Sequence, residues 1–313
     1  MKKTLAIIIS AVLILALAAA CGDSTTPDPA SPPAAPASSP NAPASPAASP
    51  AAPSNPESTF DADRIIAVFT REEGSGTRDA FVSTTGVGDD MYIEAVVISE
   101  TNEILTKVEE SEYAISYVSV GSLSDRVKAL SVSGVIPSDA TIKNGTYQIQ
   151  RPLLVCINAD SAQNGLVQDF ISFMLSAQGQ AISATRWTAI DENAPTYSPG
   201  GLSGTLKVGG STSVDPLMQA LRQEYISLNP NVNIEISGGG SGAGISESTS
   251  GVIDIGMSSR ALRDNEKEAL EGIDIALDGV AIIVNTANPI SDISIDQVRN
   301  IFTGEFVRWN QVN

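Results

Sequence analysis

Residues 206–245 read LKVGGSTSVDPLMQALRQEYISLNPNVNIEISGGGSGAGI, and this stretch decides the fold class. The apolar run Leu206–Gly209 predicts a strand, and Asp215–Leu228 predicts a helix because its apolar residues recur at helical spacing. A second strand is expected at Val232–Ser237, before the glycine run Gly238–Gly244 and another helix start. The order strand, helix, strand, helix predicts an α/β fold with helices packed on a mainly parallel sheet.

The same alternation extends in both directions from this stretch. Downstream, strands are expected at Ile253–Met257 and Val280–Asn285, with a charged helix at Asp264–Glu271. Upstream, the pattern predicts strands at 64–69, 95–99, 113–120 and 151–158, and helices from 78, at 102–110 and at 167–182. A Gly/Pro-rich linker at 191–204 joins two regions of this pattern, 61–190 and 205–313.

The first sixty residues predict export from the cytoplasm. Residues 1–20 combine two lysines with an apolar run that ends in alanines, which is the pattern of a secretory signal peptide. The small residues before Cys21 resemble the lipobox of bacterial lipoproteins, which implies cleavage there, a lipid on the Cys21 sulfur and anchoring to the cell membrane. An uncleaved membrane anchor is the alternative. Residues 21–60 are rich in Pro, Ala and Ser and predict a disordered linker.

Composition argues against several classes of function. The net charge of −18 disfavours a nucleic-acid partner, because such binding needs a basic face. The chain has no histidine, which excludes a Ser-His-Asp triad and histidine metal ligands. An enzyme acting on phosphoesters would need a metal set or an activated nucleophile, and the sequence presents neither. We therefore expect no catalytic residues, no metal and no cofactor.

Three segments share a design that suits an anion. Each places glycine and small polar residues between a predicted strand and a helix start: 71–78 (REEGSGTR), 209–217 (GGSTSVDPL) and 237–245 (SGGGSGAGI). Helix N-termini present unpaired N–H groups and the positive end of the helix dipole, and glycine lets the backbone approach a ligand. One such segment also fits an ordinary turn with a helix cap, whereas three in one chain predict an anion site.

Eight segments resemble the phosphate-binding component of bacterial high-affinity phosphate ABC transporters. The most specific are TREEGSGTRDAF (70–81) and DIGMSSR (254–260), and GGSTSVDPL and SGGGSGAGI are among the others. The similarity covers nearly everything from Arg64 to Asn313. It implies a two-lobed periplasmic-binding-protein-like fold (type II) with inorganic phosphate in the cleft. It also implies closure of the lobes around phosphate and delivery to a membrane permease.

The resemblance also implies which residues hold phosphate. Matched by position, one lobe contributes Arg71, Ser75, Gly76 and Thr77, and the other contributes Thr212, Ser213, Ser241 and Ser259. The arginine would supply charge and a two-pronged donor to the phosphate oxygens. The serines, threonines and glycine would supply hydroxyl or backbone N–H donors.

Ser259 departs from many family members, which have an aspartate that accepts the proton of protonated phosphate. Without that carboxylate, selectivity against sulfate must come from elsewhere. Glu73 and Asp79 flank the GSGT turn and are candidates, with an ordinary solvent-facing role as the alternative. The ligand stays open between phosphate and another tetrahedral oxyanion such as sulfate or molybdate. A sensor or adhesion lipoprotein that reuses the fold is a further alternative.

The two regions stand in the reverse of the family's usual order. Region 61–190 resembles the C-terminal half of the family protein, and region 205–313 resembles its N-terminal half. This order predicts a circular permutation, which is feasible where the original termini lie close together at the surface. A site completed by domain swapping and a fragment of a longer protein are the alternatives.

Overall fold

The structure is a computed structural model that describes residues 60–312. The predicted signal peptide at 1–20, the predicted lipid site Cys21 and the linker up to residue 59 lie outside the described residues. Within 60–312, no helix combines the length and hydropathy that crossing a membrane requires.

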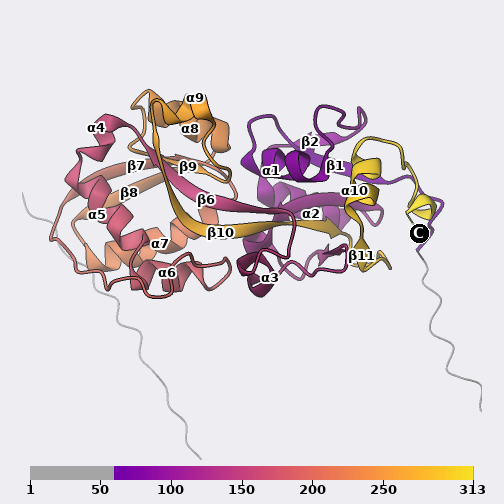
Figure 1. Ribbon diagram of the computed structural model, residues 1–313, viewed down its shortest axis with the longest axis horizontal. Helices are drawn as coiled ribbons and strands as arrows, with labels where there is room; N and C mark the ends of the chain where they lie inside the picture. The colour runs from indigo at the N-terminus through magenta and orange to yellow at the C-terminus, as the bar shows by residue number, and fades with distance from the viewer. Residues whose placement is uncertain (1–59, 313) are drawn as a thin grey trace, which may run out of the picture. The chain divides into compact units, whose positions relative to one another are not determined.

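A mixed sheet forms the centre of the described protein, with the strand order β2-β1-β3-β10-β6-β9-β7-β8 and with β4 paired to β10 (Figure 1). Its strands are β1 (Ala67–Arg71), β2 (Val96–Ile98), β3 (Ala114–Ser119), β4 (Lys128–Ala129), β6 (Gln150–Ile157), β7 (Gly204–Gly210), β8 (Val232–Ser237), β9 (Ile255–Ser258) and β10 (Glu271–Val284). A separate parallel pair joins β5 (Ser131–Val132) to β11 (Asp292–Ile293).

Strand direction differs between the outer and the central strands of this sheet. Strand β1 runs parallel to β2 and β3, and β7 runs parallel to β8 and β9, as the alternating pattern predicts. The central strands β6 and β10 run antiparallel to each other and to the neighbours that they pair with. The prediction of a mainly parallel sheet is therefore wrong for the centre, because β6 and β10 cross between two lobes and do not belong to strand-helix-strand units.

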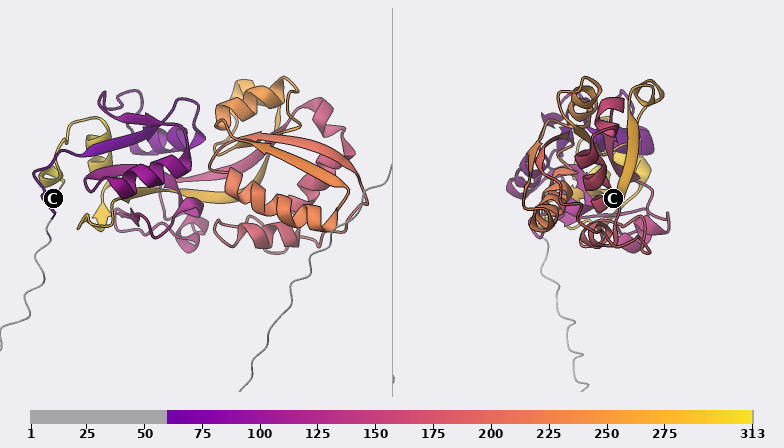
Figure 2. Two further views of the ribbon diagram at one scale, coloured as in Figure 1. Left: turned by 180° about the vertical axis from the view of Figure 1, so that it is seen from behind. Right: turned by 90° about the vertical axis from the view of Figure 1, so that its left-hand side faces the viewer.

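Strand β10 belongs to both lobes. Its residues 271–279 pair with β6, and its residues 280–284 pair with β3. Where the two sets of pairs meet, the Val280 N–H donates at 2.7 Å to the carbonyl of Ile149, the residue before β6. We call residues 60–149 and 280–312 lobe 1, and residues 150–279 lobe 2 (Figure 2). Each lobe thus draws on both sequence regions.

Helices cover the sheet in both lobes. Lobe 1 has α1 (Gly76–Thr85), α2 (Thr101–Glu110), α3 (Asp139–Lys143), α10 (Ile295–Phe302) and 3₁₀ turns at Val120–Ser122 and Trp309–Gln311. Lobe 2 has α4 (Ala159–Ala162), α5 (Gly165–Met174), α6 (Ala177–Ser183), α7 (Asp215–Leu228), α8 (Ser241–Thr249) and α9 (Asp264–Lys267).

Two predicted helices differ from the observed ones. The helix expected at 167–182 is two helices, because Ser176 caps α6 by accepting a hydrogen bond from the Gly179 N–H. The charged helix expected at 264–271 ends at Lys267, and Glu271 already pairs with Ile157 in the sheet. The apolar strand expected at 280–285 is the end of the longer β10.

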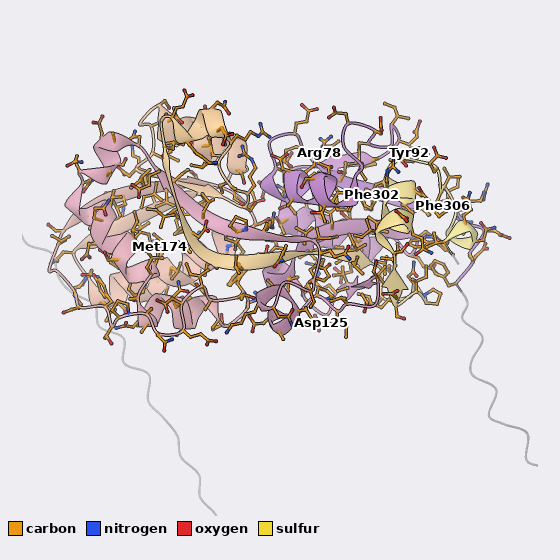
Figure 3. The ribbon with its side chains drawn as sticks, viewed as in Figure 1. Arg78, Tyr92, Asp125, Met174, Phe302 and Phe306 are labelled. Atoms are coloured by element: carbon orange, nitrogen blue, oxygen red, sulfur yellow. The ribbon has the colours of Figure 1, made fainter. Side chains whose placement is uncertain are left out.

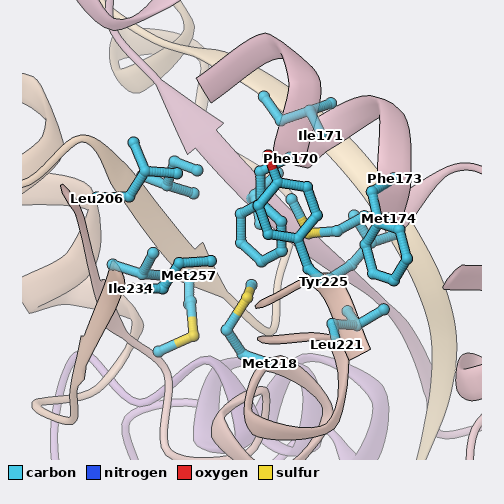
Figure 4. Packing of buried hydrophobic residues seen from close by; sticks show 14 of the residues in the cluster. Phe170, Ile171, Phe173, Met174, Leu206, Met218, Leu221, Tyr225, Ile234 and Met257 are labelled. Carbon is cyan, nitrogen blue, oxygen red and sulfur yellow. The ribbon is translucent and has the colours of Figure 1, made fainter. Parts of the chain in front are cut away.

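Each lobe has its own hydrophobic core. In lobe 2, side chains from α5 and α7 pack on β7 and β9 (Figure 4). Phe170 and Phe173 come from α5, Leu221 and Tyr225 from α7, and Met257 from β9. In lobe 1, Phe81 of α1 stacks on Tyr117 of β3 with ring centroids 4.0 Å apart, and Phe302 of α10 packs edge-on against Phe81. The cores fix the ends of β1, β7 and β9, and these ends carry the residues described below.

The joining segment 191–204 is tied to lobe 2 by a buried hydrogen-bond cluster. The hydroxyls of Tyr197 and Tyr225 both donate to Asp169 Oδ2 at 2.6 Å, and Asn229 donates to the Tyr197 oxygen at 3.0 Å. Burial, followed by the hydrogen bond to Asp169, raises the pKa of Tyr197, which therefore stays a donor at neutral pH.

We expect Tyr197→Phe to lower the free energy of unfolding by about 1–2 kcal/mol, because it removes a buried charge-assisted hydrogen bond and leaves its partners less satisfied. Chemical denaturation would measure the change. Tyr92→Phe is the matched control, since Tyr92 is partly buried against the core of lobe 1 and lies outside this cluster. Equal stability of the two variants would contradict a role for this cluster in holding the joining segment.

Candidate anion-binding site

The ends of four strands, β1, β7, β8 and β9, bring the predicted residues to one place between the lobes. Arg71 ends β1, and Ser75, Gly76 and Thr77 form the start of α1. Across from them, Thr212 and Ser213 precede α7, Ser241 begins α8, and Ser259 follows β9. All of these residues are buried, with exposed fractions of at most 8% for those other than the glycine. We call them the cleft cluster.

Direct hydrogen bonds join the two halves of the cleft cluster within one chain. Arg71 Nη2 donates to Thr212 Oγ1 at 3.0 Å, and the hydroxyls of Thr77 and Ser213 are 2.8 Å apart. The Gly242 N–H also donates to the carbonyl of Gly74 at 3.0 Å. The two sequence regions therefore meet at this cluster without a second chain.

Hydroxyls dominate the lobe 2 side of the cluster. Ser211 donates to Ser259 Oγ at 3.0 Å, and the hydroxyls of Ser241 and Ser259 are 3.3 Å apart. The backbone N–H of Ser259 donates to Ser241 Oγ at 3.1 Å. Ser211 is not among the predicted site residues, although it lies in the GGSTSVDPL segment beside Thr212 and Ser213, which are. Hydroxyls can donate and accept, so this group suits a ligand with both protonated and bare oxygens.

Arg71 is held in one orientation by several partners. Its Nε and Nη2 donate to the two carboxylate oxygens of Glu72 at 2.9 and 3.0 Å. Nη2 also donates to the Ser99 carbonyl at 2.7 Å, and Nη1 donates to Thr101 Oγ1 at 3.3 Å. With a side chain only 3% exposed, this guanidinium is a fixed, water-poor positive charge beside Thr212.

A second buried arginine contacts the cluster and was not predicted. Arg151 of β6 donates from Nη1 to Thr77 Oγ1 at 2.7 Å, and it forms an ion pair with Asp278 of β10. Burial raises the pKa of the Asp278 carboxyl, while Arg151 and contacts with Ser119 and Gly121 oppose that rise. In the sequence, RPLLVCIN indicated only a buried strand, and no local signal pointed from Arg151 to a partner far along the chain.

Neither of the two carboxylates proposed to read a phosphate proton lies in the serine group. Glu73 is exposed at the surface. Asp79 Oδ2 accepts from Arg263 at 2.9 Å and pairs with Arg260 Nε at 2.9 Å, which links α1 of lobe 1 to lobe 2. Glu72, between Arg71 and Glu73 in the sequence, is the nearer acid, and both of its oxygens are engaged by Arg71.

Helix N-termini supply further positive potential at the cluster. Helices α1, α7 and α8 all begin there, with Ser75 capping α1 by accepting from the Arg78 N–H. A cavity of about 540 Å³ adjoins the cluster and is lined by Thr101 and Thr212 together with Arg126 and Arg186. Within residues 60–312, no group of three or more Asp, Glu or Cys residues is arranged to hold a metal ion. The arrangement suits a small oxyanion.

Comparison with protein families supports a classification. The sequence model described as a PBP superfamily domain matches residues 55–178 and 195–313. The chain belongs to the PBP superfamily. Two relatives of this PBP-superfamily chain are named "Phosphate-binding protein PstS 2". The one from Streptococcus pneumoniae serotype 4 is 38% identical over 260 residues, which cover 80% of this chain and 89% of the relative. The one from Streptococcus agalactiae serotype V is 34% identical over 267 residues, which cover 82% and 91%.

A solved structure agrees with this assignment to the PBP superfamily. It is described as the crystal structure of a phosphate ABC transporter, phosphate-binding protein from Streptococcus pneumoniae TIGR4. It is 38% identical to this chain, superposes with a TM-score of 0.66, and covers 80% of this chain and 100% of its own. The alignment with the S. pneumoniae relative runs through both sequence regions, so that relative has them in the same order as this chain.

Proposed function

We propose that this chain binds inorganic phosphate between its lobes and delivers it to the membrane permease of a phosphate ABC transporter. The cleft cluster carries this proposal: one fixed arginine, hydroxyls from both lobes and the N-termini of three helices meet in a buried space. The names of the relatives, which are phosphate-binding proteins, support the choice of ligand. The chain acts by binding and not by catalysis.

Phosphate would be held by contacts that surround a tetrahedral anion. Arg71 supplies charge, while Ser75, Gly76 and Thr77 supply N–H and hydroxyl donors from lobe 1. The remaining contacts come from Thr212, Ser213, Ser241 and Ser259 of lobe 2. Because the ligand touches both lobes only when they are together, phosphate favours the closed arrangement, which the permease then recognises.

The predicted N-terminal segments fit the same function. A signal peptide at 1–20 exports the protein, a lipid on Cys21 anchors it to the membrane, and the following linker gives the lobes reach. The order of regions 61–190 and 205–313 is a circular permutation of the usual family order, and one chain forms the site by itself. A single phosphate per monomer in native mass spectrometry is the expected result, and obligate dimers would count against it.

Calorimetric titration with phosphate tests the proposed function directly. The purified protein is first stripped of bound anions, and the titration is then repeated with sulfate or molybdate present. We expect one phosphate per chain. Tighter binding of sulfate or molybdate would transfer the proposal to that oxyanion, and no binding of any oxyanion by folded protein would favour a sensor or adhesion role.

Ser259→Asp is expected to increase discrimination between phosphate and sulfate by about tenfold or more. A carboxylate at this buried position would accept the proton of hydrogen phosphate, whereas it would repel sulfate, which has no proton to donate. Competition calorimetry on both proteins measures the ratio of the two affinities. Ser250→Asp, on the exposed end of α8, controls for added negative charge. An unchanged ratio would mean that Ser259 does not face the ligand.

A further inference from the structure

Arg151 occupies an unusual position in the fold. It lies at the start of β6, where the chain passes from lobe 1 to lobe 2, and its side chain is 2% exposed. Asp278 is its partner in the register of β6 and β10, and lies where β10 makes the return crossing. The Asp278 side chain is fully buried. The ion pair therefore sits between the two strands that connect the lobes.

The geometry of this ion pair directs part of the guanidinium toward the cleft cluster. Nε and Nη2 of Arg151 donate to the same atom, Asp278 Oδ2, at 3.1 and 2.9 Å. Nη1 donates instead to Thr77 Oγ1, which in turn contacts Ser213 of lobe 2. Within the described residues these bonds use three of the five N–H groups of the guanidinium. Further donors are available beside the predicted ligand Thr77.

The Arg151 guanidinium, at the edge of the cleft cluster, is close enough to that of Arg71 for the two charges to interact. Burial lowers the pKa of Arg151, Asp278 opposes this, and the charge of Arg71 lowers it further. Each guanidinium already has a carboxylate partner, Glu72 for Arg71 and Asp278 for Arg151, and an anion that contacted both would relieve their remaining mutual repulsion. A neutral hydrogen-bond donor would be enough to hold the Thr77 hydroxyl in place. The contact is made instead by an arginine that forms an ion pair with a buried carboxylate.

We propose that Arg151 is a second anion-binding guanidinium of the cleft, which together with Arg71 gives the site its preference for a doubly charged oxyanion. The inference rests on the proposed function, since it assumes that phosphate occupies the cleft cluster. Arg151, on the crossing strand β6, would thus determine specificity in addition to the contacts from the two lobes.

The test compares phosphate in its two charge states. The full chain is titrated at about pH 5.5, where phosphate is mainly a monoanion, and at about pH 8, where it is mainly a dianion. The variant is Arg151→Met with Asp278→Asn, because removing the arginine alone would leave a buried carboxylate without its partner. Arg222→Met is the control: Arg222 lies about two turns into α7 and donates to the Ile234 carbonyl of β8.

We expect the double variant to lose about 100-fold in affinity at pH 8 and about tenfold at pH 5.5, with Arg222→Met near wild type at both. Equal losses at the two pH values, or no loss, would overturn the proposal, because a purely structural role does not distinguish the charge of the ligand. Failure of the wild-type protein to bind phosphate would instead overturn the proposed function.

A second variant covers the case in which the double variant does not fold. Arg151→Lys keeps the positive charge beside Asp278 and loses the planar fork of donors. We expect this variant to lose about tenfold in affinity at both pH values and to keep the wild-type preference for the dianion. Wild-type affinity in Arg151→Lys would show that the guanidinium does not contact the ligand.

Discussion

Replacing Arg71 by alanine is expected to weaken phosphate binding by about 100-fold or more. The guanidinium is buried, fixed by Glu72 and Ser99, and within 3.0 Å of Thr212 across the cleft. Charge-assisted hydrogen bonds each contribute about 1.5–3 kcal/mol, and two of them to one ligand account for a loss of this size. The loss is increased because Glu72 then faces the anion without its partner.

Calorimetric titration of Arg71→Ala and of a neighbouring control checks this expectation. Arg78 lies on the same helix start (Figure 3), and within residues 60–312 its guanidinium donates only to the Arg71 carbonyl, at 3.4 Å. Arg78→Ala removes the same charge from the same loop and is expected to change the affinity by no more than about threefold. Near-native affinity in Arg71→Ala would mean that the ligand binds elsewhere.

Gly76→Ala is expected to abolish phosphate binding while leaving the fold intact. A Cβ at this position would lie 2.6 Å from the hydroxyls of Ser241 and Ser259 and 2.9 Å from the Ser259 backbone carbon. The hydroxyls can rotate, but the backbone of lobe 2 cannot yield without the lobes moving apart. Contacts from the two lobes could then no longer reach the same anion.

The stability of Gly76→Ala distinguishes this effect from misfolding. Gly76 is the first residue of α1, where alanine has the higher helix propensity, so we expect thermal stability equal to or above wild type. Gly165→Ala is the matched control, because Gly165 is also the first residue of a helix and has open space around its Cβ position. If Gly76→Ala binds phosphate like Gly165→Ala, the lobes do not close on this loop.

The local parts of the site could be predicted from the sequence. Glycine and serine between a strand and a helix start fix the backbone over a few residues. The sequence therefore predicts the three turns, and their side chains meet in the structure. The Arg151–Asp278 pair could not be predicted, because its members lie 127 residues apart and are joined only by strand register. For the same reason the sequence predicts only the apolar end of β10, and its mixed first half, 271–279, gives no sign of the pairing with β6.

Because β10 is hydrogen-bonded into both lobes, the lobes cannot slide apart. For the opening and closing proposed above, we expect the lobes to rotate about an axis through Gly279–Val280 and the neighbouring Ile149–Gln150, where both strands cross between them. Arg151 and Asp278 directly neighbour this axis in the sheet and are expected to move little, whereas the contact between Asp79 and Arg263 is expected to break when the lobes open. We therefore expect a proposed ligand to meet Arg151, which lies beside the axis, while the lobes are still apart, and to be enclosed when they close.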